Sequence, residues 1–322
     1  MSHVRRWAGP ATSVAVLAIV IWRIGTGPFV TGFESVDGRA LLAAAAIGFV
    51  TTVCGAWRWT IVARGLDLPM SLPAAVAAYY RALFLNLTLP TGIAGDVHRG
   101  VSHGREVRHV GRAVRAVVWE RGAGQAVQAV LMISILLMLP SPVQSVMPFV
   151  ALAAVGLAVV AVLGGRLQLG GADSRWMRLR NAVVDDLRNG VLRRNALPAI
   201  VLASTVAVLG YAAMFLVAAR TVGVTAPISR LLPVALLATL AMVLPSVAGW
   251  GPREGAAVWV FSAAGLGAAA GAATAVAYGV LVFVAFLPGA VVLLAGWLPR
   301  GRVSKPRPRS RPVFRPKGAA DA

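Results

Sequence analysis

Long apolar segments alternate with short polar ones along almost the whole chain. The apolar segments cover residues 8–22, 40–63, 73–89, 113–139, 146–164, 197–219, 227–243 and 275–298. A helix of about 20 apolar residues is long enough to cross a bilayer, so the pattern predicts an all-α, polytopic membrane protein. We expect about six full spans, because segments 73–89 and 227–243 both run into sequence that a spanning helix does not tolerate.

Two related stretches rich in Pro and Gly follow those two segments. Residues 89–100 read LPTGIAGDVHRG and residues 244–255 read LPSVAGWGPREG, and one gap aligns Arg99 with Arg253. Proline and glycine both disfavour a helix interior, and broken backbone survives in a bilayer only where protein or water satisfies it. Breaks in both halves of a membrane protein are typical of a transport site near the midplane. Two ordinary loops that share a turn are the alternative.

The basic residues orient these segments, because Lys and Arg concentrate on the cytoplasmic side. Residues 99–115, 165–196 and 300–317 are rich in Arg, whereas residues 25–38 hold two acids and no Lys or Arg. We therefore expect cytoplasmic termini, an uncleaved first helix rather than a cleaved signal peptide, and an outer loop at 25–38.

The same charges give the two broken segments opposite directions in the membrane. Residues 73–111 then enter and leave on the cytoplasmic side, and residues 228–270 on the outer side, as oppositely oriented re-entrant helical hairpins. This is the inverted-repeat architecture of transporters. Arg220 and Arg230 are left outside, against the general trend.

Composition supports the class. Hydrophobic residues make up 58% of the chain and charged residues 13%, with a mean hydropathy of +0.77, whereas a soluble domain carries about 25% charge. The net charge of +20 borders membrane segments, so we expect contact with anionic lipids and not with nucleic acid. The single cysteine, Cys54, excludes an internal disulfide.

We divide the chain into two parts. Residues 1–298 form an integral membrane domain with halves at about 1–164 and 197–298, joined by a cytoplasmic loop at 165–196 that holds a short amphipathic helix. Residues 299–322 form a basic tail rich in Pro and Arg, which we expect to be disordered. Gly267 and Gly271 have the GxxxG spacing of packed membrane helices, which is compatible with a homodimer.

The broken segments carry the chemistry of an anion site. Asp96 is placed to cap the helix after the first segment, and Pro252 suits the first position of the helix that holds Glu254. Each helix would aim its N-terminus, with free N–H groups and a positive dipole, into the protein interior. Arg99 and Arg253 would stand beside these N-termini. In a membrane the obvious anion is a lipid phosphate.

Further charges lie within the apolar segments. Glu120 and Arg121 lie in the predicted span at 113–139, where ionisable residues are costly and mark functional sites by default. Packing through ion pairs is the alternative. Arg58 lies between two tryptophans and either reaches the interface or contacts a lipid phosphate. The residues that we expect to bind lipid or anion are Arg58, Gly92, Gly95, Asp96, Arg99, Glu120, Arg121, Gly249, Gly251, Arg253 and Glu254.

Enzymatic signatures are weak. His98, His103 and His109 lack the spacing of a helical zinc pair, and the chain has no GxSxG, Walker, CxxC or dinucleotide motif. We expect no catalytic residue, no metal and no cofactor. A membrane-embedded transferase that uses Asp96 or Glu120 as a base is the alternative.

At these residues the chain resembles the lysylphosphatidylglycerol synthase transmembrane, or flippase-like, family. This is the membrane half of the multiple-peptide-resistance factors. The matching features are Trp57-Arg58-Trp59, the blocks at 89–100 and 244–255, and Glu120-Arg121 followed by Gly124. The first block usually reads PGG-GGD-R, whereas here it holds Pro90-Thr91-Gly92, and His98 precedes Arg99.

The resemblance implies a lipid-handling membrane domain. Relatives are proposed to move aminoacylated phosphatidylglycerol or related lipids between leaflets, and some are tied to polyprenyl-linked sugar transfer. The soluble synthase domain is absent, so we expect no lipid synthesis. We predict a translocase of the bacterial-type inner membrane for an anionic or aminoacylated phospholipid or a polyprenyl phosphate. A transferase or accessory protein in polyprenyl-phosphate glycosylation is the alternative.

Overall fold

The computed structural model describes residues 18–89, 92–166, 175–241 and 251–297, and within these ranges every regular element is a helix. Residues 18–24 are helical and form the described end of the first predicted helix. The elements that follow are α2 (Gly27–Glu34), α3 (Gly38–Gly65), α4 (Leu72–Thr88), α5 (Ala94–Glu106), α6 (Val110–Met138), α7 (Met147–Arg166), α8 (Arg175–Asp186), the π-helix η1 (Leu187–Val191), α9 (Leu197–Thr221), α10 (Ile228–Leu240), α11 (Pro252–Ala263), α12 (Ala268–Phe286) and α13 (Pro288–Trp297).

Four helical stretches in the described ranges are long and apolar enough to cross a bilayer. They are α3, α6, α9 and the joined α12–α13 stretch Ala268–Gly296. The predicted helices at 40–63, 113–139 and 197–219 thus lie where the apolar pattern placed them. The chain is a multi-pass, all-helical membrane protein.

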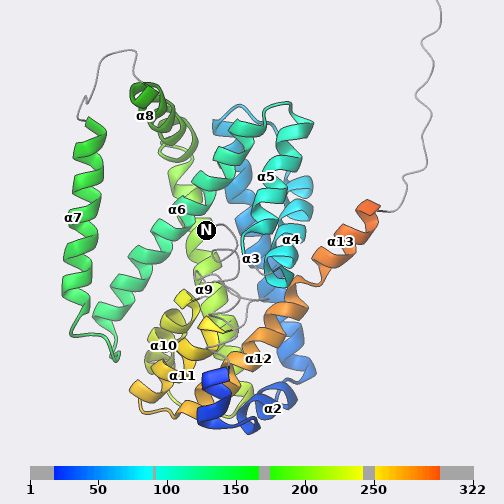
Figure 1. Ribbon diagram of the computed structural model, residues 1–322, viewed down its shortest axis with the longest axis vertical. Helices are drawn as coiled ribbons and strands as arrows, with labels where there is room; N and C mark the ends of the chain where they lie inside the picture. The colour runs from blue at the N-terminus through cyan, green and yellow to red at the C-terminus, as the bar shows by residue number, and fades with distance from the viewer. Residues whose placement is uncertain (1–17, 90–91, 167–174, 242–250, 298–322) are drawn as a thin grey trace, which may run out of the picture.

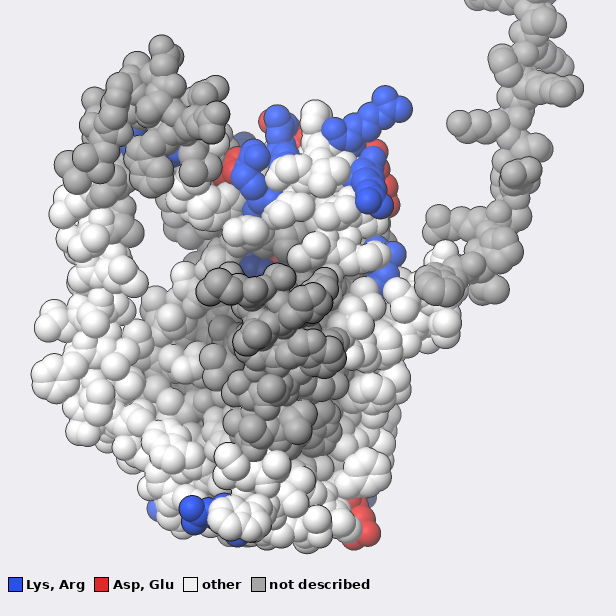
Figure 2. All heavy atoms as spheres, in the orientation of Figure 1, with Lys and Arg blue, Asp and Glu red and all other residues white. Residues whose placement is uncertain are grey.

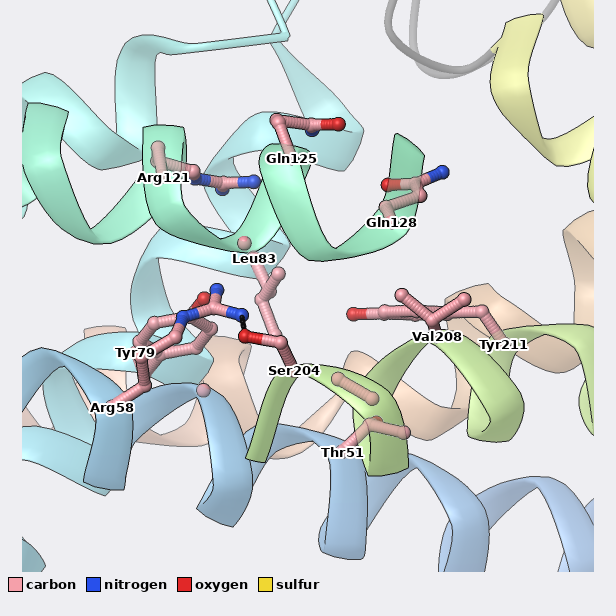
Figure 3. A pocket seen from close by; sticks show the side chains of 13 residues that line it. Thr51, Arg58, Tyr79, Leu83, Arg121, Gln125, Gln128, Ser204, Val208 and Tyr211 are labelled. Carbon is pink, nitrogen blue, oxygen red and sulfur yellow. Dashed lines mark hydrogen bonds between the residues drawn. The ribbon is translucent and has the colours of Figure 1, made fainter. Parts of the chain in front are cut away.

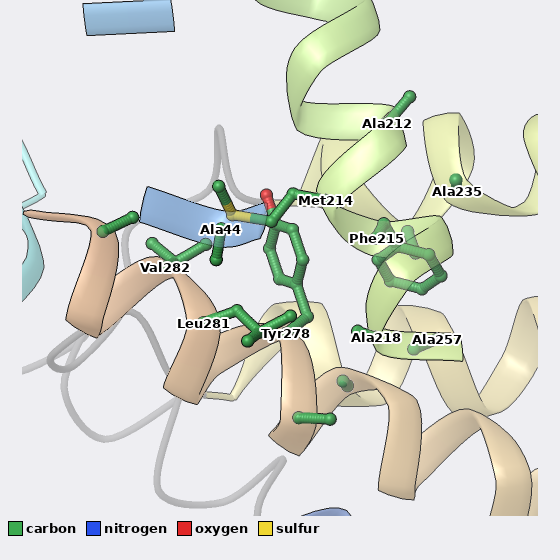
Figure 4. Close-up of a cluster of buried hydrophobic side chains, with 14 of the residues drawn as sticks. Ala44, Ala212, Met214, Phe215, Ala218, Ala235, Ala257, Tyr278, Leu281 and Val282 are labelled. Carbon is green, nitrogen blue, oxygen red and sulfur yellow. The ribbon is translucent and has the colours of Figure 1, made fainter. Parts of the chain in front are cut away.

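The core of the molecule is the packing of α3, α9 and α12 against one another. Figure 4 shows Tyr278, Phe215 and Met214 at the centre of this cluster, and the rings of Phe215 and Tyr278 have centroids 5.4 Å apart. Small residues allow the backbones to approach: a Cβ added to Gly48 would lie 2.6 Å from Cβ of Ala285. Membrane helices without a hydrophobic driving force associate through such close van der Waals packing.

Two pairs of shorter helices pack on this core. α4 packs against α5, and α10 packs against α11. In Figure 1, α4 and α5 occupy the upper half of the molecule, whereas α10 and α11 occupy the lower half. A Cβ added to Gly95 would lie 2.0 Å from the carbonyl oxygen of Ala82, so only glycine allows α5 to approach α4 this closely.

Charged side chains gather at the two ends of the molecule. Figure 2 shows most of the basic side chains, all of them Arg among the described residues, at the top, a smaller group of charges at the bottom, and mostly uncharged residues on the described surface between them. At the lower end, Arg220 donates to the carbonyl of Val224 at 2.7 Å and Arg230 to that of Ala264. Both arginines therefore satisfy carbonyls at helix ends.

The polar segment 165–196 contains the predicted helix, here α8 followed by η1. Asp186 anchors it to α6, because its carboxylate accepts from Arg115 Nε at 2.6 Å and from Trp119 Nε1 at 3.2 Å. In Figure 1 this element lies at the top, at the same end as the junction of α5 with α6.

Several details differ from the sequence predictions. The loop predicted at 25–38 contains α2, which packs on α12 because Gly32 meets the carbonyl of Ala273. The last helix begins at Ala268 instead of 275, and it is interrupted at Leu287, just before Pro288. Gly271 packs against the backbone of Ala257 within the same chain. Residues 1–17 and the tail from 298 lie outside the described ranges.

Candidate functional site

Glu120, on α6, is the centre of a buried network that joins four helices. Its Oε1 accepts from Arg58 Nε at 2.9 Å and from the hydroxyl of Tyr79 at 3.2 Å. Its Oε2 accepts from Arg99 Nη2 at 2.5 Å. The side chains of Glu120 and Arg99 are 0% exposed. One carboxylate therefore holds two guanidinium groups inside the protein.

Arg58 extends the network to α9. Its Nη1 donates to Ser204 Oγ at 2.9 Å, and Ser204 in turn donates to the carbonyl of Ile200. The guanidinium lies against Gly124 of α6, where a Cβ would come within 2.7 Å of Nη1. The absence of a side chain at Gly124 thus makes the space for Arg58, and Arg58 does not reach the interface as the simpler sequence interpretation had it.

Aromatic rings enclose Arg99 on α5. Its guanidinium carbon lies 4.7 Å from the ring centroid of Trp59 and 4.5 Å from that of Tyr79. Such cation–π contacts are worth about 0.5–2 kcal/mol, with the larger values where the cation is desolvated. Arg99 Nη1 is buried without a hydrogen-bond partner within the described part of the chain. The site therefore retains an unused donor next to its central ion pair.

Asp96 ties the start of α5 to α4 and α6. Its Oδ1 accepts from Arg99 Nε at 2.9 Å, and its Oδ2 pairs with Arg121 Nη2 at 2.6 Å and accepts from Asn86 Nδ2 at 2.9 Å. The prediction that Asp96 caps the helix is wrong, because α5 begins two residues earlier, after Ile93. Asn86 Oδ1 instead accepts from the N–H of Gly95, at 2.7 Å.

A pocket of about 90 Å³ lies beside this network, between α3, α4, α6 and α9. Figure 3 shows Arg58 bonded to Ser204 on one side of the pocket, Arg121 and Gln125 on α6 above it, and the hydroxyl of Tyr211 turned inward from α9. The side chain of Arg121 is 37% exposed, so this guanidinium links the buried network to the outside of the bundle.

The second broken segment forms a separate buried ion pair at the start of α11. Pro252 occupies the first helical turn, as predicted, and Glu254 Oε2 accepts from the N–H of Gly251 at 2.6 Å. Arg253 pairs with Glu254 and lies over the ring of Tyr278, 5.4 Å from its centroid. Gly251 has φ 108°, a conformation that other residues rarely adopt.

The structure brings together five of the predicted residues in one network: Arg58, Asp96, Arg99, Glu120 and Arg121. Gly95 lies at the contact of α5 with α4, and Gly92 has φ 66° in the turn between them. Gly251, Arg253 and Glu254 lie together at the start of α11. Gly249 lies outside the described residues.

Sequence reasoning missed several polar partners of these residues. Tyr79, Asn86, Ser204 and Tyr211 supply hydrogen bonds or line the pocket. Each is a polar residue inside an apolar helix, and Asn86 stands out in a segment of mostly aliphatic residues. A polar residue inside an apolar helix indicates a functional or packing role. It does not show which other residue the polar group contacts.

Comparison with known proteins gives one match. The family model described as "Lysylphosphatidylglycerol synthase TM region" matches residues 6–289. The match covers all the helices of the network and the second ion pair. No curated protein and no solved structure matches the chain significantly.

Proposed function

Because the chain belongs to the Lysylphosphatidylglycerol synthase TM region family, we propose that it is a lipid translocase. It moves a lipid with an anionic headgroup between leaflets, and the headgroup binds beside the network of Glu120. Membership of this lipid-related membrane family supports a lipid ligand.

The observation that carries the proposal is the charge balance of the buried network. Among the described residues, Arg58, Arg99 and Arg121 pair with two carboxylates, those of Glu120 and Asp96, so this group of five carries one excess positive charge. Two of its donors, Arg99 Nη1 and Arg121 Nε, are buried without a hydrogen-bond partner in the described ranges. Unbalanced charge at membrane depth is costly. A bound phosphate would neutralise the excess positive charge and would accept hydrogen bonds from the two unpaired donors.

We further propose that α4–α5 and α10–α11 are re-entrant hairpins of opposite direction. At about 1.5 Å per residue, the 13 residues of α5 and the 12 residues of α11 reach only part of the way across a hydrocarbon core of about 30 Å. Their N-termini then stand at depth, where the positive helix dipole favours an anion. This arrangement is typical of transporters with inverted repeats.

We propose an orientation in a bacterial-type inner membrane with both termini in the cytoplasm. The end of the molecule that carries α8 and the junction of α5 with α6 faces the cytoplasm, because most of the described Arg side chains gather there. The hairpin α4–α5 then opens from the cytoplasm and α10–α11 from the outside. The contact of Gly271 with the backbone of Ala257 within the same chain explains why residue 271 is a glycine, without a homodimer.

A membrane-embedded transferase or an accessory protein of polyprenyl-phosphate glycosylation is the competing function. A transferase base needs a carboxylate that is free to take a proton. Both oxygens of Glu120 and both oxygens of Asp96 are engaged by arginines, so neither carboxylate has an oxygen free to contact a substrate. This favours transport over transfer.

The test is lipid translocation in proteoliposomes, with fluorescent phosphatidylglycerol and a fluorescent polyprenyl phosphate as probes. Wild-type protein should move at least one of them. Glu120→Gln should slow this movement about tenfold or more, because it removes the carboxylate that Arg58 and Arg99 share. Arg112→Gln is the matched control on the same helix, because its contact with Asp67 at 3.9 Å is exposed.

Arg121→Gln provides a second variant in case Glu120→Gln fails to fold. Its side chain lines the pocket and is partly exposed, so the fold should tolerate the change while translocation slows. If wild type moves neither lipid, or if both variants move lipid at the wild-type rate, the translocase proposal is wrong and the glycosylation alternative gains.

A further inference from the structure

The pocket beside the buried network is lined by positive and neutral polar groups. Arg58 and Arg121 supply the positive charge, and Gln125, Gln128, Ser204 and Tyr211 supply neutral hydrogen-bonding groups. Among the described residues that line it there is no Asp and no Glu. A cationic ligand group in this pocket would face two guanidinium groups without an opposing carboxylate.

The nearest carboxylates are already engaged. Glu120 uses one oxygen for Arg58 and Tyr79 and the other for Arg99. Asp96 uses one oxygen for Arg99, and the other for Arg121 and Asn86. An incoming ammonium group could pair with either acid only by displacing an arginine, which would leave that guanidinium buried and unpaired.

The neutral groups of the pocket suit hydroxyls. Gln125 and Gln128 are three residues apart on α6 and therefore lie on the same face of the helix. Figure 3 shows both side chains above the pocket and the hydroxyl of Tyr211 opposite Gln128. Amide and phenol groups both donate and accept hydrogen bonds, so they match a sugar or glycerol hydroxyl in either direction.

We propose that this pocket selects lipids whose headgroup is a phosphate ester bearing an uncharged, hydroxylated group, and that it discriminates against aminoacylated, cationic headgroups. This inference rests on the proposed function, since it names the substrate class of the same site. Two sources share the chemistry: a glycerophospholipid such as phosphatidylglycerol, and a glycosylated polyprenyl phosphate.

The test measures binding to the purified full chain in detergent. Fluorescent phosphatidylglycerol is the bound probe, and the competitors are dioctanoyl phosphatidylglycerol, dioctanoyl lysylphosphatidylglycerol and a short-chain polyprenyl phosphohexose. The lysyl lipid should compete at least about tenfold more weakly than phosphatidylglycerol, because its ammonium groups meet Arg58 and Arg121. Of the other two competitors, dioctanoyl phosphatidylglycerol and the polyprenyl phosphohexose, the stronger identifies the source.

A charge variant tests the cause of the selectivity. Gln128→Glu places a carboxylate in the pocket and should improve competition by the lysyl lipid about fivefold or more while weakening phosphatidylglycerol. Gln128→Met has a similar length and no charge, so it should not improve the lysyl lipid. Gln125→Glu, one turn away on the same face, replaces Gln128→Glu if that variant does not fold.

The outcomes separate this inference from the proposed function. If wild type binds phosphatidylglycerol but the lysyl lipid competes equally well or better, the selectivity is wrong and the lipid site stands. If the chain binds selectively but translocates no lipid, the transport function is wrong and the selectivity stands. If no lipid competes at all, both are wrong.

Discussion

At the scale of single residues, the most unusual feature is that five charged side chains are held inside a membrane protein. Isolated charges at this depth cost several kcal/mol each. Here Glu120 and Asp96 each bridge two arginines, and Tyr79 and Ser204 satisfy further groups. The five charges are therefore stable together. The loss of one of them leaves its partners buried and unpaired, which lowers the stability of the fold.

The first prediction concerns that unit. Glu120→Ala should destabilise the protein by about 3–5 kcal/mol, because it leaves Arg58 and Arg99 buried without their shared partner. Unfolding in mixed detergent micelles measures the change. Arg112→Ala removes an exposed ion pair with Asp67 and should cost about 0–1 kcal/mol. Equal effects of the two variants would contradict the central role of Glu120.

The second prediction concerns the shape of Arg99. Lys retains the charge but lacks the planar fork that bonds Asp96 and Glu120 while stacking on Trp59 and Tyr79. Arg99→Lys should therefore destabilise the protein by about 1–3 kcal/mol and weaken lipid binding. Arg105→Lys, at an exposed position on the same helix, is the control and should change neither quantity. A wild-type melting temperature for Arg99→Lys would show that charge alone suffices.

At the scale of elements, the hairpin α4–α5 positions half of the network. Asn86 at the end of α4 holds both the N–H of Gly95 and the carboxylate of Asp96. The two helices approach closely at Gly95. The direction of the start of α5, and with it the position of Arg99, therefore depends on one small residue and one amide.

The third prediction tests this dependence. Gly95→Ala places a methyl group 2.0 Å from the carbonyl oxygen of Ala82, and since backbone cannot move aside easily, it should destabilise the protein by about 1–3 kcal/mol. Gly100→Ala on the same helix meets its nearest atoms at 3.4 Å, and the higher helix propensity of alanine should leave stability unchanged or raise it by up to about 1 kcal/mol. Thermal unfolding measures the stability of both variants. A Gly95→Ala variant as stable as wild type would contradict the close packing of α5 on α4.

At the scale of the whole molecule, charged side chains gather at the two ends, and the described surface between them forms a mostly uncharged belt. α7 packs against α6, and many of its apolar side chains, such as Phe149, Leu152 and Leu157, are exposed. In a bilayer, lipid covers such surfaces. The orientation of the protein in the membrane then sets whether each hairpin opens toward the cytoplasm or toward the outside.

The fourth prediction tests the two opposed hairpins by cysteine labelling in a Cys54→Ser background. A membrane-impermeant maleimide should label Thr225→Cys and Ser262→Cys, which flank α10–α11, from outside intact bacterial cells. It should label Ser71→Cys and Glu106→Cys, which flank α4–α5, only after the membrane is opened. All four positions are exposed, and labelling of Ser71→Cys and Glu106→Cys from opposite sides would mean that α4–α5 crosses the membrane.

Hydropathy and a few motifs were enough to predict the class of protein, the family and nearly all the helix positions. The reason is physical: a bilayer requires long apolar helices, so hydropathy and the positions of Pro and Gly report helix ends directly. The sequence also indicated most of the charged site residues, because a charge inside an apolar helix stands out. It did not reveal α2, whose eight residues are too short for a hydropathy signal.

The packed helices were needed to show which of these residues contact one another. Arg58 and Glu120 are 62 positions apart, and Arg58 and Ser204 are 146 apart. In a membrane helix the faces toward lipid and toward protein are both apolar, so the sequence pattern does not show which face packs inward. The partners of Glu120 are therefore fixed by small residues at helix contacts, such as Gly95 and Gly124, whose spacing becomes meaningful only once the helices are packed.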